Sequence, residues 1–467
     1  MNLFTNLKVE SESRHMLSSG QEIHTALMSN GRLVAVTPDL GHWAVLPGEM
    51  YDSLAGGEGS RALEEIPGLE DVLLRPAREE SEFRAINPWV IKVADFCNMA
   101  CSYCYEDAQP ESRRMAPGLA EKLVDEMLSL EQRSYTVLFH GGEPTLNMEC
   151  VELIVRELNR RAPPETKIQY MMHSNLLAVD AAKQERIREL GIRLGSSLDG
   201  DGETSDQQRV AISGRGTHDR VVEHLRVMPA RERYLILTIT SANVGELLAA
   251  AVHFVEDLEV PSFHFLPLLP HGRPGVETKI PDTEAMTDGI FEVFDYVLDL
   301  WRDGRRVHFR NLETPIRSLH APAFTSACQS CTLGGTSAQS ITVSWDGVFG
   351  PCDASANIPR LQLGNIEDCD RDLADYMVSG RNFRIFKNLR DIPGCDTCAV
   401  RMQCGGGCEE EALKPGESRT VYCDHYYRMY YAVMAATPEL DELGYRNAVL
   451  GKSGDRSGRM KLRASVA

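Results

Sequence analysis

Cys97-Asn98-Met99-Ala100-Cys101-Ser102-Tyr103-Cys104 places three thiols within eight residues. The stretch follows a short apolar run, Trp89-Val90-Ile91-Lys92-Val93-Ala94, whose β-branched residues are typical of a buried strand. We therefore expect the strand to end in a loop that carries the cysteines. Loops at the C-terminal ends of parallel strands carry the chemistry of α/β barrels. Three thiolates can hold three irons of a four-iron cluster and leave the fourth open, whereas a structural zinc site usually has four ligands.

The length, charge and apolar content of the chain limit the kinds of partner that we expect. The chain has 467 residues, enough for roughly three domains of about 150 residues each, and its net charge of -19 argues against nucleic acid as a partner. Residues 1–8 lack the pattern of a signal peptide, and no apolar run approaches the roughly 18 residues that a membrane span needs. We expect a cytoplasmic protein with no membrane partner.

Strand and helix patterns alternate over residues 86–310. The expected strands are 88–94, 135–140, 167–172, 192–198, 233–240 and 262–269. Alternating units imply a parallel sheet with helices outside it. Because there are six units rather than eight, we expect an α/β fold with an open, partial (β/α)6 TIM-like barrel.

Residues 1–85 are expected to form a small α+β domain. Residues 22–28 and 33–36 flank Asn30-Gly31, which predicts a β-hairpin. A helix is expected to begin near residue 47, and the polar stretch 75–82 is the expected linker to the barrel.

The thirteen cysteines are grouped along the chain, as metal clusters require. A chain without an export signal is not expected to rely on disulfides. The groups are Cys97, Cys101 and Cys104; Cys328, Cys331 and Cys352; and Cys395, Cys398, Cys404, Cys408 and Cys423. Cys150 and Cys369 stand apart and are expected to pack as small apolar side chains. We expect a cysteine-rich domain over 311–430, followed over 431–467 by a C-terminal helix and a flexible basic tail.

The spacing Cys-x3-Cys-x2-Cys, with an aromatic residue before the last cysteine, resembles the signature of radical S-adenosylmethionine (SAM) enzymes. About forty residues later, Gly141-Gly142-Glu143-Pro144 resembles the segment of that family that binds the methionine amino group. The resemblance assigns further SAM contacts to Tyr103 beside the adenine, Asn175 beside the ribose, and Ser197 and Arg209 at the carboxylate.

The C-terminal cysteines and Gly347 resemble the SPASM extension, a twin-cluster domain of enzymes that modify peptides and proteins. Seven cysteines match this extension: Cys331, Cys352, Cys395, Cys398, Cys404, Cys408 and Cys423. Two four-iron clusters need eight thiolate ligands, and Cys328 can supply the eighth. By resemblance, the first auxiliary cluster takes Cys328, Cys331, Cys352 and Cys408, and the second takes Cys395, Cys398, Cys404 and Cys423. If Cys328 is not a ligand, the first cluster has an open iron. Zinc is the alternative metal, because a Cys-x2-Cys pair is also a zinc knuckle.

The resemblance implies SAM and three 4Fe-4S clusters as cofactors, and an electron donor such as flavodoxin or ferredoxin. The N-terminal domain resembles a leader-peptide recognition element, which binds a precursor peptide by adding its strand to a sheet edge. A plain structural extension is the alternative for that domain. Asp353, directly after Cys352, is by resemblance the base in substrate oxidation.

We therefore expect a radical SAM oxidoreductase that forms an oxidative C–C, C–O or thioether cross-link within a ribosomal precursor peptide. A sulfatase-type maturase that converts Cys or Ser to formylglycine is the alternative within enzymes. A non-catalytic iron–sulfur or zinc protein, used for electron transfer or as a scaffold, is the alternative from another class.

Overall fold

The computed structural model describes residues 2–55, 59–74, 87–108, 113–273, 275–320, 340–350, 352–354, 358–359, 362–368, 392–412 and 419–451. The expected linker 75–82, the cysteines Cys328, Cys331 and Cys369, and the expected tail beyond residue 451 lie outside these described residues. Within the described ranges, no helix combines the length and the apolar character that crossing a membrane requires.

The N-terminal domain is a four-stranded antiparallel sheet in the order β1-β2-β3-β4, followed by three short helices. Its elements are β1 (Val9–Met16), β2 (Glu22–Met28), β3 (Arg32–Thr37), β4 (His42–Pro47), α1 (Tyr51–Ala55), α2 (Gly59–Glu64) and α3 (Leu69–Leu73). The predicted hairpin is confirmed as β2 and β3, and Gly31 has the positive φ of 72° that such a turn favours. The sequence analysis did not predict β1 or β4.

Both faces of the N-terminal sheet are covered. Leu33 and Ala35 pack into a small core with the short helices, whereas Val34 and Val36 belong to the main core of the protein. The apolar run of β3 is continuous because the strand is buried on both faces.

The second sheet has ten strands, and its central six are the predicted parallel strands. They are β5 (Trp89–Ala94), β6 (Ser134–Gly141), β7 (Lys167–His173), β8 (Ile192–Ser197), β9 (Tyr234–Ile239) and β10 (Ser262–Pro267). The short β11 (His308–Phe309) extends the sheet beyond β10, and β12 (Ile341–Val343), β13 (Val348–Gly350) and β14 (Gly364–Asn365) extend it beyond β5. The expected α/β partial barrel is confirmed.

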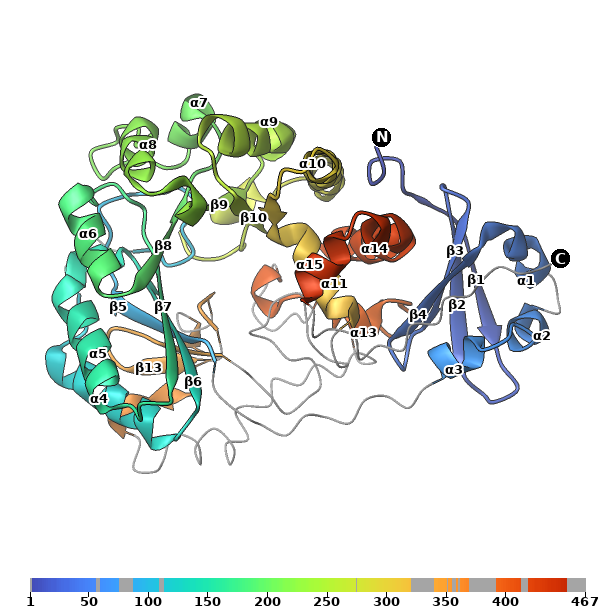
Figure 1. The fold of residues 1–467 in the computed structure, drawn as a ribbon, viewed down its shortest axis with the longest axis horizontal. Helices are drawn as coiled ribbons and strands as arrows, with labels where there is room; N and C mark the ends of the chain where they lie inside the picture. The colour runs from blue at the N-terminus through green and yellow to red at the C-terminus, as the bar shows by residue number, and fades with distance from the viewer. Residues whose placement is uncertain are drawn as a thin grey trace.

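Helices cover the outside of this barrel (Figure 1). They include α4 (Pro117–Ser129), α5 (Met148–Arg161), α6 (Ala181–Glu189), α7 (Gly202–Asp206), α8 (His218–Val227), α9 (Leu247–Val252) and α10 (Thr283–Arg302). The amphipathic α5 shows why these segments are helical: Val151, Ile154, Val155 and Leu158 recur at helical spacing and are buried.

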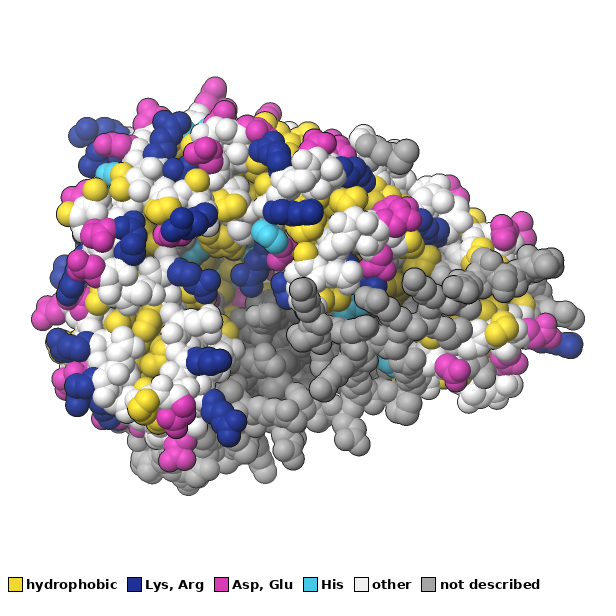
Figure 2. Space-filling view, viewed as in Figure 1, with side chains coloured by type: hydrophobic (Ala, Val, Ile, Leu, Met, Phe, Trp, Pro, Cys, Tyr) yellow, Lys and Arg dark blue, Asp and Glu magenta, His cyan; other side chains and the backbone are white. Residues whose placement is uncertain are grey.

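A second group of helices joins the barrel to the N-terminal domain. It comprises α11 (Arg310–His320), α13 (Arg401–Cys404), α14 (Cys423–Glu442) and α15 (Tyr445–Leu450). The long α14 lies between the barrel and the N-terminal sheet (Figure 1), and it runs without interruption across residue 430, the expected domain boundary. Arg32 of β3 donates to Glu439 Oε1 of α14 at 2.7 Å, which ties the sheet to this helix. On the face drawn in Figure 2, basic and acidic side chains alternate over the barrel rather than forming one patch.

Candidate active site

The loop that follows β5 packs directly against the end of β6. The amide of Gly142 donates to Ala94 O at 2.9 Å, and that of Glu143 donates to Phe96 O at 2.9 Å. A Cβ at position 142 would lie only 2.3 Å from Phe96 O. The sequence analysis assigned this glycine to the segment that binds the methionine amino group of SAM. The structure shows that the cysteine loop itself makes the close approach.

Glu143 is buried, and its carboxylate is held by neighbouring donors. Oε1 accepts from Thr145 N at 3.1 Å and from Ser174 Oγ at 2.8 Å, and Oε2 accepts from Asn175 N at 2.8 Å. The side-chain amide of Asn175 lies 3.3 Å from Cys97 Sγ. Two residues predicted from separate strand ends therefore meet beside the first cysteine. Their expected contacts with SAM stay predictions.

The opposite side of the cysteine loop pairs with residues 208–211. Ala100 N donates to Val210 O at 2.7 Å, and Ser102 N donates to Gln208 O at 2.9 Å. The three-cysteine loop is thus held from both sides by backbone hydrogen bonds.

Tyr103 links Arg209 to Asp199. Its hydroxyl donates to Asp199 Oδ2 at 2.6 Å and accepts from Arg209 Nη1 at 2.6 Å. All three side chains are buried, and burial raises the pKa of Asp199 despite the nearby guanidinium. The sequence analysis placed Tyr103 and Arg209 at different parts of SAM. The structure brings the two together and adds Asp199, which had no assigned role.

The three partly buried thiols lie close enough to one another to interact electrostatically. Burial raises the pKa of Cys97 to about 12, with the Glu143 carboxylate adding to the effect, and raises that of Cys101 to about 11. A metal-free site would therefore hold protonated thiols, and metal binding would release their protons.

Zinc, the alternative metal, would hold its thiolate ligands close together. Two thiolates on one tetrahedral zinc would lie about 3.8 Å apart, given Zn–S bonds of about 2.3 Å. Among the described residues, the one group that brings three potential ligand atoms within 4.8 Å of one another is Glu106, His140 and Asp353, and it contains no cysteine. Four thiolates at the corners of a four-iron cluster would lie farther apart than that.

A group of charged side chains lies near the end of β5, beside the cysteine loop, with Lys92 and Glu106 buried and Asp353 partly exposed. The Lys92 ammonium is 2.6 Å from Glu106 Oε1 and 3.8 Å from Asp353 Oδ1, and His140 Nδ1 is 3.6 Å from the same Asp353 oxygen. The Tyr105 hydroxyl donates to Asp353 Oδ2. The ammonium lies among the three potential ligands and offsets part of their negative charge.

The acid–base state of this group follows from its contacts. Burial acts to lower the pKa of Lys92, but Glu106 and Asp353 outweigh it, so the net pKa is raised. Burial acts to raise the pKa of Asp353, but His140 and Lys92 outweigh it, so the net pKa is lowered. A cavity of about 470 Å³ opens beside Lys92, Tyr105 and Glu106, and it gives the charged group access to a ligand.

Strand register places His140 and His173 in the same polar layer. Lys92 is the register partner of His140, and His173 is the partner of Gly195 on the next strand. The two imidazole rings are stacked with centroids 5.8 Å apart, and burial lowers the pKa of His173 to about 3. His173 is therefore neutral at ordinary pH.

The structure brings four C-terminal cysteines together. Burial raises the pKa of Cys404, and the thiols of Cys398, Cys423 and Cys395 are close enough for each to raise it further. The amide of Cys398 donates to Cys395 O at 3.2 Å. This is the ligand set expected for the second auxiliary cluster, and its four thiols fit such a group.

The ligand set expected for the first auxiliary cluster is described only in part. Cys352 lies near enough to Lys92 to contribute to its raised pKa, and Cys408 lies near Tyr426. Cys328 and Cys331 are outside the described residues.

Residues 91–238 match the Radical SAM superfamily. The chain therefore carries a radical SAM domain, with the three thiols at the end of β5 inside it, followed by a cysteine-rich C-terminal region.

Among individual proteins, the chain is similar to the serine-type anaerobic sulfatase-maturating enzyme of Klebsiella aerogenes, with 25% identity over 352 residues that cover 73% of this chain and 83% of the relative. The fold is similar to the solved structure of anSMEcpe with bound AdoMet, at a TM-score of 0.66 and 21% identity, covering 78% of this chain and 98% of the other. It is also similar to Streptococcus suis SuiB bound to its precursor peptide SuiA, at a TM-score of 0.52 and 14% identity, covering 89% and 99%.

The structure also places the remaining predicted residues. Gly141 ends β6, Pro144 opens the turn that follows, and Ser197 ends β8. The sequence analysis assigned no role to Lys92, Glu106 or His140. The position of Lys92 inside a buried apolar strand was the available signal, because a buried lysine requires a partner.

Proposed function

We propose that this chain is a radical SAM maturase that removes hydrogen from a residue of a ribosomal precursor peptide and forms an oxidative cross-link within it. The observation that carries the proposal is the N-terminal domain docked beside Cys398 and Cys423, two of the cysteines expected to bind the second auxiliary cluster. The similarity to SuiB covers 89% of this chain, more than residues 87–467 could supply, so it includes part of that domain.

The residues beside the cysteine triad are proposed to hold SAM. Glu143 and Asn175 lie next to Cys97, and Arg209 lies next to Tyr103. When bound, SAM and the clusters supply a 5′-deoxyadenosyl radical and accept the electron that the substrate loses. Backbone hydrogen bonds on both sides of the loop orient the triad, and the surrounding burial excludes water.

Asp353 is proposed to accept the proton that the substrate releases. A cross-link between two residues removes two hydrogens, one as an atom and one as a proton with its electron. The Asp353 carboxylate lies at the charged group, beside Cys352, with Tyr105 and His140 to orient it. The adjoining cavity of about 470 Å³ is the proposed place of the reacting side chain.

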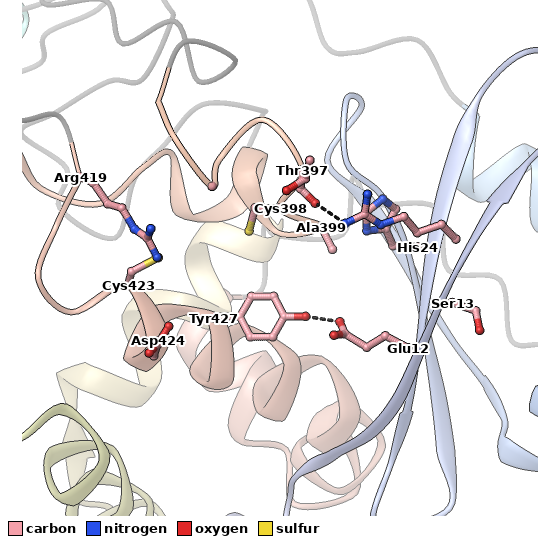
Figure 3. A pocket seen from close by; sticks show the side chains of 12 residues that line it. Glu12, Ser13, His24, Thr397, Cys398, Ala399, Arg419, Cys423, Asp424 and Tyr427 are labelled. Atoms are coloured by element: carbon pink, nitrogen blue, oxygen red, sulfur yellow. Dashed lines mark hydrogen bonds between the residues drawn. The ribbon is translucent and has the colours of Figure 1, made fainter.

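The N-terminal sheet is proposed to bind the leader of the precursor. Among the described strands, β1 pairs with β2 alone, so its other edge can accept a peptide strand. A cavity of about 490 Å³ lies between β1 and the cysteine-rich region, with Glu12 of β1 and Tyr427 of α14 hydrogen-bonded across it (Figure 3). A reduced flavodoxin or ferredoxin is proposed as the electron donor.

The test is anaerobic incubation of the reconstituted protein with SAM, a reductant and the peptide encoded beside the gene. We expect 5′-deoxyadenosine together with a peptide lighter by two hydrogens. The matched control is Asp353→Asn, which should still cleave SAM but form less cross-linked peptide. A peptide of unchanged mass in the presence of 5′-deoxyadenosine would contradict cross-link formation.

The sulfatase-maturating relatives make formylglycine formation the second candidate. Oxidation of Ser to formylglycine also removes two hydrogens, so mass alone does not separate the candidates. An aldehyde product reacts with hydroxylamine, whereas a cross-link suppresses fragmentation between the joined residues. A colourless protein that binds zinc, lacks absorbance near 400 nm and forms no 5′-deoxyadenosine would instead support the non-catalytic alternative.

A further inference from the structure

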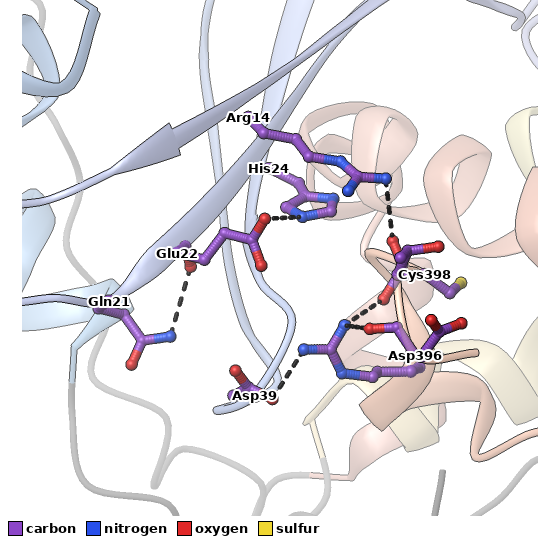
Figure 4. Close-up of polar contacts among 9 residues, drawn as sticks. Arg14, Gln21, Glu22, His24, Asp39, Asp396 and Cys398 are labelled. Atoms are coloured by element: carbon purple, nitrogen blue, oxygen red, sulfur yellow. Dashed lines mark hydrogen bonds and ion pairs between the residues drawn. The ribbon is translucent and has the colours of Figure 1, made fainter. Parts of the chain in front are cut away.

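The N-terminal domain makes direct contact with the loop that carries Cys395 and Cys398. Arg401 of α13 is 5% exposed, and its Nη2 donates to Asp39 Oδ1, in the turn between β3 and β4, at 2.7 Å. Its Nη1 donates to the carbonyl oxygens of Asp396 at 3.2 Å and Cys398 at 3.0 Å. These contacts are drawn in Figure 4, where Asp39 lies on the N-terminal side and Asp396 and Cys398 on the other. One guanidinium thus joins the two parts of the chain.

Neighbouring contacts hold the same turn against α13. Gln403 is buried, and its Nε2 donates to Gly41 O at 2.9 Å. A Cβ at Gly41 would lie 3.1 Å from Met402 Cβ, and the φ of 70° there favours glycine. The turn between β3 and β4 is therefore held in one position against α13, and this position places the Asp39 carboxylate next to Arg401.

Arg401 also acts on the thiol group electrostatically. Its Nη1 lies 3.0 Å from the carbonyl oxygen of Cys398, so its positive charge lies directly beside the loop that carries this thiol. A guanidinium stays protonated at all ordinary pH values, so it is a fixed positive charge. Reduction adds negative charge to a cluster, so a nearby fixed cation favours the reduced state and raises the reduction potential.

We propose that Arg401 is a positioning residue through which the N-terminal domain, by way of Asp39, sets the reduction potential of the second auxiliary cluster. This inference rests on the proposed second cluster, and goes beyond leader binding because it gives the N-terminal domain a part in electron transfer. Asp39 holds one side of the guanidinium, while the other side fixes two carbonyl groups of the cysteine loop. The N-terminal domain then forms part of the protein environment of the second auxiliary cluster.

The test is a redox titration followed by electron paramagnetic resonance, with iron counted per chain, on the reconstituted full-length protein. The variants are Asp39→Asn, Arg401→Lys and Arg401→Gln, and the control is Glu65→Gln, which removes an exposed ion pair of the same domain. We expect one midpoint potential to fall in Arg401→Gln, which removes the positive charge, and to rise in Asp39→Asn, which removes a negative charge and leaves the guanidinium, while the other potentials stay unchanged. Arg401→Lys keeps the charge and should recover most of the shift.

The outcomes separate this inference from the proposed function. A wild-type protein with fewer than about twelve irons would overturn the assignment of three clusters, and this inference with it. A wild-type protein with three potentials, none of which moves in Asp39→Asn or in a folded Arg401 variant, would overturn only the inference. Selective loss of about four irons in Arg401→Gln would support it, whereas equal loss from all clusters would overturn it. If Arg401→Gln does not fold, the midpoint potentials of Asp39→Asn are the test: a shift in one potential supports the inference, and unchanged potentials overturn it.

Discussion

The ammonium of Lys92 lies 2.6 Å from Oε1 of Glu106, and both side chains are more than nine-tenths buried. Lys92 is carried by β5 and Glu106 by the loop that follows the third cysteine, so the pair connects the strand to the cluster loop. Removing one partner would leave a buried charge without compensation, which costs much more than losing an exposed ion pair.

Lys92→Met is therefore expected to lower the free energy of unfolding by about 3–5 kcal/mol, because Glu106 and Asp353 lose their shared cation. Urea denaturation of the anaerobically purified protein measures the change. The double variant Lys92→Met/Glu106→Gln should recover part of the loss. Arg61→Met, which removes the exposed partner of Glu65, should cost about 0–1 kcal/mol. If Lys92→Met and Arg61→Met lowered the free energy of unfolding equally, the buried pair would contribute no more to stability than the exposed pair.

Cys101→Ala is expected to abolish SAM cleavage while leaving about eight irons per chain, because the auxiliary clusters use other thiols. Iron analysis and 5′-deoxyadenosine release measure the two effects. Cys150→Ala is the matched control, since Cys150 is a buried residue of α5 outside the three cysteine groups. It should keep about twelve irons and full SAM cleavage. Continued formation of 5′-deoxyadenosine by the Cys101 variant would refute the assignment of the triad.

Gly142→Ala is expected to displace the cysteine loop, because the new Cβ would lie 2.3 Å from Phe96 O, a backbone atom that cannot move alone. We expect reduced iron loading of the first cluster, measured as irons per chain after reconstitution, and weaker SAM binding. Gly118→Ala in the first turn of α4 is the control, because its Cβ would meet no atom within 4 Å. Normal loading of the Gly142 variant would show that the loop adapts without affecting the site.

Local pattern predicted the barrel because apolar runs and helical periodicity are properties of short segments. The resemblance to the radical SAM family, rather than local pattern, assigned Gly142, Asn175 and Arg209 to the SAM site, and the structure places all three near the cysteine loop. Local pattern could not pair Arg401 with Asp39, which is 362 residues away in the chain. It also could not place Asp353 over His140, because β12 pairs with β5 after more than two hundred intervening residues. Contacts of that kind depend on strand order and register, which the sequence does not display locally.

His320 is expected to make stability depend on pH. It ends α11, where its Nε2 lies 3.3 Å from Arg446 Nη1, and burial together with that guanidinium lowers its pKa to about 4. Below its ordinary pKa of about 6.5, the unfolded chain binds a proton that the folded chain does not. The contribution of His320 to stability is therefore complete above that pH and is lost as the pH falls toward 4.

Between pH 7.5 and pH 5, this linkage should cost the wild-type protein about 2 kcal/mol of the free energy of unfolding, and His320→Phe should remove most of that dependence. Urea denaturation at the two pH values measures the difference. His308→Phe is the matched control of opposite sign: Glu313 raises the pKa of His308, so its contribution is present at low pH and is lost as the pH rises through the folded pKa. Loss of His308 should steepen the decline toward pH 5. Identical pH dependence in wild type and His320→Phe would show that His320 is protonated as easily in the folded chain as in the unfolded one.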